Sequence, residues 1–133
     1  MADPADGRAA PQPPGRSWLS KFGDAFRGLF LAVRTQSSFA AHLPVAAAAV
    51  AGGWLCDFSG AEWCLVVLAI GGVLAAEVFN TSIEEIARAM NTGPHPGIRD
   101  ALDVASGGVL VAVGTAIVVG LVLFGPRILD WLG

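Results

Sequence analysis

The sequence predicts an all-α membrane protein, in which an N-terminal amphipathic surface helix precedes three transmembrane helices. Hydrophobic residues make up 54% of the 133 residues and charged residues only 14%, whereas soluble domains carry about 25% charged residues. The chain has too few polar side chains to cover a soluble globule, so lipid must be part of its solvent. The hydrophobic residues also gather in three long segments, and this grouping predicts the number of spans.

The first predicted element is a surface helix over residues 17–36, after a Pro- and Ala-rich tail over residues 1–16 that we expect to be disordered. Ser17 is a suitable N-cap for this helix. Large apolar side chains recur along it at three- and four-residue spacing, and most polar side chains lie opposite. An amphipathic helix with basic residues beside membrane spans is typical of the lipid–water interface.

The three apolar segments that follow are each long enough to cross a bilayer of roughly 30 Å, which needs about 20 helical residues. The predicted spans cover about 39–55, 61–83 and 104–124. We expect the second helix to continue in polar residues toward Met90. The third is expected to stop at Gly125-Pro126, because a glycine followed by a proline commonly ends a helix.

The basic residues predict the orientation. Of the eight Lys and Arg residues, only Arg127 follows the last span, and the others precede the first span or lie between the second and third. Cytoplasmic loops carry an excess of Lys and Arg, so the N-terminus is predicted to be cytoplasmic and the C-terminus to lie on the other side. Trp54, Trp63 and Trp131 then fall near the outer interface, where tryptophan is enriched.

One polar face in the second predicted helix carries the first candidate site residues. Glu77, Asn80, Thr81 and Glu84 fall within an arc of about 100° on a helical wheel. Glu77 lies inside an apolar span, where a carboxylate costs on the order of 3 kcal/mol at the helix centre. A residue kept at that cost is a candidate functional group. The alternative interpretation is a structural hydrogen bond inside the helical bundle.

A second acidic position opens the third span. Asp103 follows Arg99 by one helical turn, and Glu84 and Asp103 are predicted to stand at the same membrane boundary on adjacent helices. Acidic residues that converge on one surface can hold a divalent metal and a nucleoside triphosphate. The alternative is that they cap helix ends and pair with Arg88 or Arg99. The sequence has no GxxxxGK[ST] phosphate loop and no protein-kinase glycine loop.

Three motifs give the chain a resemblance to a known family. The run AEVFNTSIEE over residues 76–85, the run HPGIRDALDVASGGVLV over 95–111 and the run FGDAFRGL over 22–29 resemble the prokaryotic diacylglycerol kinase and undecaprenol kinase family. The likeness covers about residues 17–125. It implies phosphoryl transfer from magnesium-ATP to the hydroxyl of a membrane lipid in the bacterial inner membrane, with a periplasmic C-terminus. It also implies a homotrimer with active sites shared between subunits; no nucleic-acid partner is expected.

The resemblance also implies roles for single residues. Glu77 would be the general base that takes the proton of the lipid hydroxyl, and Asn80 would orient groups near it. The residues implied to lie at the nucleotide are Glu84, His95, Arg99 and Asp103, and those implied to hold the metal ion are Glu84 and Gln36. A partly desolvated glutamate has the raised proton affinity that a base needs.

The chain departs from the family pattern at four positions. Gln36 stands where the family has a second metal-binding glutamate, and an amide oxygen brings no charge. Leu102 replaces a lysine, Ala40 replaces an arginine and Arg88 replaces an acid. Two possibilities follow. Either the chemistry is retained with a rearranged phosphate-binding site, in which Arg88 and Arg99 supply positive charge, or the chain is a catalytically weakened or non-enzymatic relative.

Three further questions stay open at the level of sequence. An ion pathway through Glu77 is disfavoured, because no ionisable residue continues it outward through the spans. The substrate is diacylglycerol or undecaprenol; His42 and His95, which the undecaprenol kinase branch also tends to have, slightly favour a polyprenol. Cys56 and Cys64 flank the outer loop and can pair in an oxidising periplasm, although the unpaired state is favoured.

Overall fold

The structure, a computed structural model, describes residues 17–90, 93 and 95–133. The described chain forms four helices, which are α1 (Trp18–Thr35), α2 (Ser38–Leu55), α3 (Gly60–Met90) and α4 (Pro96–Leu132). The predicted fold class, an all-α membrane protein with a surface helix and three transmembrane helices, is confirmed. The tail predicted over residues 1–16 lies outside the described residues.

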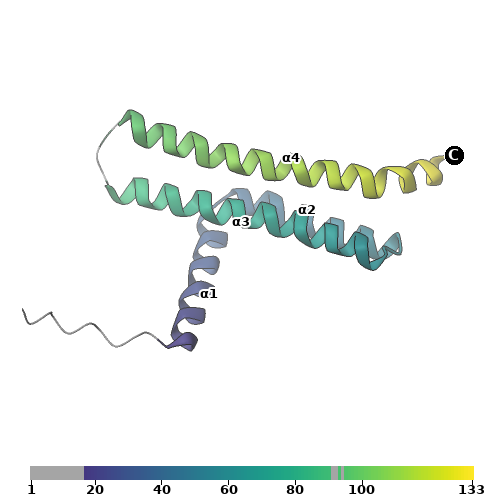
Figure 1. The fold of residues 1–133 in the computed structure, drawn as a ribbon, viewed down its shortest axis with the longest axis horizontal. Coiled ribbons are helices and arrows are strands. Elements are labelled where there is room, and N and C mark those ends of the chain that lie inside the picture. The colour runs from purple at the N-terminus through teal and green to yellow at the C-terminus, as the bar shows by residue number, and fades with distance from the viewer. Residues whose placement is uncertain (1–16, 91–92, 94) are drawn as a thin grey trace, which may run out of the picture.

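Helices α2, α3 and α4 run side by side along the long axis of the molecule, and α1 leaves this bundle steeply (Figure 1). Helix α1 begins at the predicted cap, where Ser17 Oγ accepts a hydrogen bond from Ser20 N at 3.2 Å. It ends at Gln36, whose backbone is extended and turns the chain into α2. The apolar side chains of α1 are exposed in the single chain, as expected of a helix that lies on a lipid surface.

Helices α2, α3 and α4 have the length and composition of membrane spans. They contain 18, 31 and 37 residues, so at about 1.5 Å per residue α2 just crosses a bilayer while α3 and α4 exceed it. The excess of α3 and α4 extends past the level at which α1 leaves the bundle (Figure 1). We call this end of the bundle, where α3 connects to α4, the loop end, and the opposite end, with the α2–α3 turn, the hairpin end.

The helix that contains the third predicted span is longer than that span at both ends. Helix α4 starts at Pro96, capped by His95, whose Nδ1 accepts from Gly97 N at 3.2 Å. The predicted stop at Gly125-Pro126 is wrong, because α4 continues to Leu132. Proline removes one backbone donor from the helix. The neighbouring turn is held instead by Arg127, whose guanidinium donates to the Leu123 carbonyl at 2.7 Å.

The hairpin end is tied together by an ion pair and aromatic rings. Arg127 Nη2 lies 2.8 Å from Glu62 Oε1, and its guanidinium carbon lies 4.6 Å from the centre of the Phe58 ring. Phe58 in turn packs with Val66 and Leu123 in the hydrophobic core. The α2–α3 turn is thereby fastened to α4. Cys56 and Cys64 are unpaired in the structure.

The close approach of α2 to α4 at this end depends on a glycine. A Cβ atom on Gly52 would stand 2.9 Å from Phe124 Cε1, closer than such atoms normally come. Toward the loop end the two helices leave an apolar cavity of about 500 Å³ between them, over one face of α3. The fold therefore has a closed hairpin end and a hollow middle.

Candidate active site

Glu77 lies in the middle of α3 and is 3% exposed. Both of its carboxylate oxygens have partners from α2: Ser38 Oγ donates to Oε2 at 3.0 Å, and His42 Nε2 lies 2.8 Å from Oε1. Ser38 and His42 are four residues apart and so share one face of α2. A carboxylate withdrawn from water needs such partners, because burial without them is costly.

Glu84 lies two turns further along α3 and receives three donors. Asn80 Nδ2 donates to Oε1 at 2.9 Å, and Oε2 accepts from the side-chain amide of Gln36. Arg88 Nη2 lies 3.4 Å from Oε2. The corner between α1 and α2 thus supplies Gln36 to Glu84, just as the start of α2 supplies Ser38 to Glu77.

Asn80 keeps one hydrogen-bonding atom free. Its Nδ2 is used by Glu84, but its Oδ1 is buried and accepts no hydrogen bond from the described residues. Buried acceptors are normally paired, so this oxygen is available to a group that the chain itself does not provide. The oxygen sits between the two carboxylates in sequence, one turn from each.

The predicted polar face of α3 is therefore assembled as a unit. Thr81 Oγ1 donates to the Glu77 carbonyl at 2.8 Å and completes the set on the helix itself. Asn80 donates to Glu84, which belongs to the same predicted set. Glu77 also contacts Ser38 of α2, and Glu84 contacts Gln36 at the end of α1. The chemical roles of these residues stay predictions.

The predicted nucleotide residues of α4 lie apart from this unit. His95 caps α4, and Arg99 and Asp103 are exposed. Asp103 is seven residues into α4 and Glu84 six residues before the end of α3, so both belong to the loop end. No contact between them is found among the described residues, and no group of three His, Cys, Asp or Glu side chains there could hold a metal ion alone.

Two residues of the unit lie outside the sequence prediction of the site. The prediction does not include Ser38, and it uses His42 only as an indication of the substrate. Their four-residue spacing places them on one face of α2, but nothing in the sequence indicates that this face meets Glu77. The corner at Gln36, which sets the direction of α2, determines the contact.

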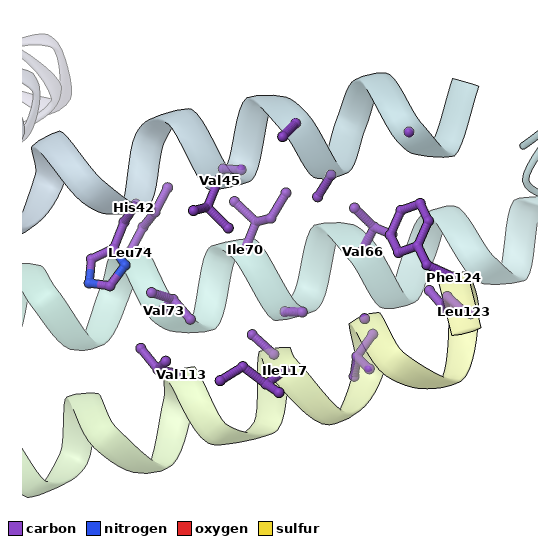
Figure 2. A pocket seen from close by; sticks show the side chains of 18 residues that line it. His42, Val45, Val66, Ile70, Val73, Leu74, Val113, Ile117, Leu123 and Phe124 are labelled. Atoms are coloured by element: carbon purple, nitrogen blue, oxygen red, sulfur yellow. The ribbon is translucent and has the colours of Figure 1, made fainter. Parts of the chain in front are cut away.

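The apolar cavity ends at this unit. Figure 2 shows His42 at one end of the cavity and Phe124 at the other, with aliphatic side chains from α2, α3 and α4 between them. Among the described lining residues, His42 is the one with a polar side chain, and Glu77 does not reach the cavity wall. The cavity is thus an apolar channel that leads to an imidazole backed by a buried carboxylate.

These features define a class of protein. It is a small helical membrane protein in which two carboxylates, each held by other side chains, lie near the place where the spans meet the surface helix. Comparison with known proteins makes the class specific. A family model described as prokaryotic diacylglycerol kinase matches residues 23–124. The chain is also 32% identical over 117 residues to the undecaprenol kinase of Bacillus subtilis (strain 168), a match that covers 85% of this chain and 95% of that protein.

The chain belongs to the prokaryotic diacylglycerol kinase family. The expected resemblance and the expected enzyme class, a lipid kinase, are confirmed. Family membership together with three apolar helices makes it an inner-membrane protein. A kinase of this class acts on a lipid alcohol and takes its phosphoryl group from a nucleotide donor.

Proposed function

We propose that the protein transfers the γ-phosphoryl group of magnesium-ATP to the hydroxyl of a membrane lipid at the cytoplasmic surface of the inner membrane. The observation that carries this proposal is the buried Glu77, with both oxygens held by side chains, one and two turns from Asn80 and Glu84. Phosphoryl transfer depends mainly on alignment and charge neutralisation. A fixed carboxylate beside an apolar channel supplies the alignment of the attacking hydroxyl.

Glu77 is the general base in this proposal. The lipid hydroxyl gives up its proton toward the Glu77 carboxylate, while the hydroxyl oxygen bonds to the γ-phosphorus. Ser38 and His42 hold the carboxylate in place for this role. Asn80 then orients the reacting groups through its free Oδ1.

The donor set fits a magnesium ion that is shared with nucleotide phosphates. Glu84 offers a carboxylate, and Asn80 offers a buried amide oxygen without a partner among the described residues. Protein-bound Mg²⁺ is commonly held by one or two carboxylates together with substrate phosphates. When bound there, the ion would neutralise charge on the phosphates. Gln36 can join through its amide oxygen only after its amide group turns, since its nitrogen now faces Glu84.

The nucleotide lies against His95, Arg99 and Asp103 in this proposal. These residues are exposed at the loop end, and among the described residues no hydrogen bond or ion pair joins them to Glu77, Asn80 or Glu84. We therefore propose a homotrimer in which α4 of one subunit completes the site on α3 of another. The same proposal places the N-terminus in the cytoplasm and the C-terminus in the periplasm, as the distribution of basic residues predicts.

Undecaprenol is the substrate that we propose, with diacylglycerol as the alternative. The relative at 32% identity carries the name undecaprenol kinase, and the cavity beside His42 is elongated along the helices, apolar and about 500 Å³ in volume. A single linear polyprenol suits such a channel better than two acyl chains. Incubation of the purified protein with radiolabelled ATP and total bacterial lipid, followed by chromatography, identifies the product.

Glu77→Gln tests the base directly. The variant keeps a group of the same shape but with low basicity, so the rate of phosphoryl transfer should fall by at least about 100-fold. The melting temperature should change little, because the glutamine can still accept from Ser38. Glu85→Gln is the matched control, since Glu85 pairs with Arg88 at the helix surface and such pairs contribute little. Full activity of Glu77→Gln would remove Glu77 as the base.

A catalytically weakened relative is the second candidate, and the orientation of Gln36 favours it. Its amide nitrogen, rather than its oxygen, faces Glu84, and Leu102 leaves out one cation of the family pattern. Binding of magnesium-ATP without turnover would raise the melting temperature, since a ligand that binds the native state stabilises it. Product formation at ordinary kinase rates would exclude this candidate.

A further inference from the structure

The carboxylate of Glu77 has no free face toward the lipid. Ser38 occupies one oxygen at 3.0 Å and His42 the other at 2.8 Å, and the Glu77 side chain is only 5% exposed. The His42 side chain is 23% exposed. A hydroxyl that arrives along the apolar cavity therefore meets the imidazole before it can meet the carboxylate, as the position of His42 at the cavity end in Figure 2 illustrates.

The pairing of imidazole and carboxylate has a defined chemical use. A neutral imidazole that donates from one ring nitrogen to a carboxylate has a lone pair on the other nitrogen, which can accept a proton. His42 Nε2 is the nitrogen at Glu77 Oε1, so Nδ1 is the nitrogen left for another partner. Among the described residues, no hydrogen bond to His42 Nδ1 is found.

We propose that His42 relays the proton of the lipid hydroxyl to Glu77. The inference rests on the proposed kinase function and adds a second residue to its proton path. The lipid O–H bond breaks and its proton bonds to His42 Nδ1, while the proton on Nε2 passes to Glu77 Oε1. The lipid oxygen uses the freed electron pair to bond to the γ-phosphorus, and the bond from phosphorus to the leaving nucleotide diphosphate breaks with its electron pair. Glu77 remains the final base.

A purely structural role for His42 makes a different prediction. If the imidazole only holds Glu77 in place, any side chain that donates a hydrogen bond from the same position will serve. The side-chain nitrogen of glutamine can occupy nearly the place of His Nε2. His42→Gln therefore preserves the hydrogen bond to Glu77 but has no basic nitrogen for the relay, and it separates the two roles.

The proposal expects His42→Gln to lower kcat by at least about 100-fold, the usual contribution of a proton-transfer group. The KM for lipid and for nucleotide should stay near the wild-type values, because the aliphatic walls of the cavity and the nucleotide residues are untouched. The matched control is Ser38→Ala, which removes the hydrogen bond to the other oxygen of Glu77. Its loss should reach at most about tenfold, the equivalent of one ordinary hydrogen bond.

A kcat for His42→Gln within tenfold of wild type would overturn the relay. A measurement on the unaltered protein covers the case in which the variant does not fold. Single-turnover rates in mixtures of light and heavy water count the protons in flight: a curved dependence on deuterium fraction, which requires two protons, supports the relay, and a linear one overturns it. An unaltered protein that phosphorylates no lipid at all would instead refute the kinase proposal itself.

Discussion

At the scale of single residues, Gln36 shows how this chain rebalances the charge of its site. Its amide donates to Glu84, whereas the family pattern has a second carboxylate at this position. Arg88, which replaces an acid of the family pattern, lies 3.4 Å from the same carboxylate. Relative to the family pattern, two negative charges have been lost and one positive charge has been gained beside Glu84. The negative charge of Glu84 is therefore balanced by side chains of the protein itself. A site with two carboxylates would need a bound cation instead.

Gln36→Glu is expected to make stability depend on magnesium. Two carboxylates would then face each other, and the loss of the amide donor should lower the free energy of unfolding in EDTA by about 1–3 kcal/mol. Added Mg²⁺ should restore it, since a cation that binds the native pair stabilises that state. Thermal unfolding with EDTA and with Mg²⁺ measures the effect, with Gln36→Met as the control that removes the donor without adding charge. Equal magnesium responses in all three proteins would contradict this interpretation.

The residue scale also shows what sequence alone can reveal about the site. Glu77, Asn80 and Glu84 were predicted together because they share one helix and its period fixes their common face. Ser38 and His42 come from another helix, and their contact with Glu77 depends on the direction in which the chain leaves Gln36. Local periodicity contains no information about that direction. The pairing of α2 with α3 needs the three-dimensional structure.

At the scale of elements, α4 departs most from the prediction. A glycine and a proline at positions 125 and 126 commonly end a helix, but here the helix continues to Leu132. The local cost of the missing donor is offset by long-range contacts of Arg127 with Glu62 and Phe58. The contact with Glu62 links positions 65 residues apart, beyond the reach of a rule about neighbouring residues. The surface helix and the α2–α3 hairpin, which follow from local pattern, were predicted well.

Arg127→Met is expected to loosen the hairpin end. The variant loses the ion pair with Glu62, the contact with the Phe58 ring and the hydrogen bond to the Leu123 carbonyl. The side chains of Arg127 and Glu62 are 31% and 23% exposed, so water screens their ion pair only in part, and the midpoint of unfolding should fall. Unfolding in detergent measures the loss, with the exposed Asp130→Asn as control. An unchanged stability would mean that α4 continues past Pro126 without help from Arg127.

At the scale of the whole molecule, the single chain leaves most of its apolar surface uncovered. Only 6% of the most apolar stretch of α4 is buried inside the chain. Lipid can cover such a surface, but lipid cannot complete a catalytic site. Arg99 and Asp103 stand exposed at the loop end, at the level of Glu84 on the neighbouring helix. A second copy of the chain whose α4 packs against this α3 would cover part of the apolar surface. It would also complete the catalytic site.

Complementation between inactive variants tests that assembly. Glu77→Gln and Asp103→Asn should each be inactive alone, because each removes a required group. If Glu77 of one subunit works with Asp103 of another, trimers that contain both variants should recover about a third of the wild-type activity, since one of their three sites then has one subunit of each kind in the right order. If both residues serve within one chain, every site lacks one group and the mixture stays inactive. Co-expression with two different affinity tags, purification over both, and the lipid phosphorylation assay distinguish the two arrangements.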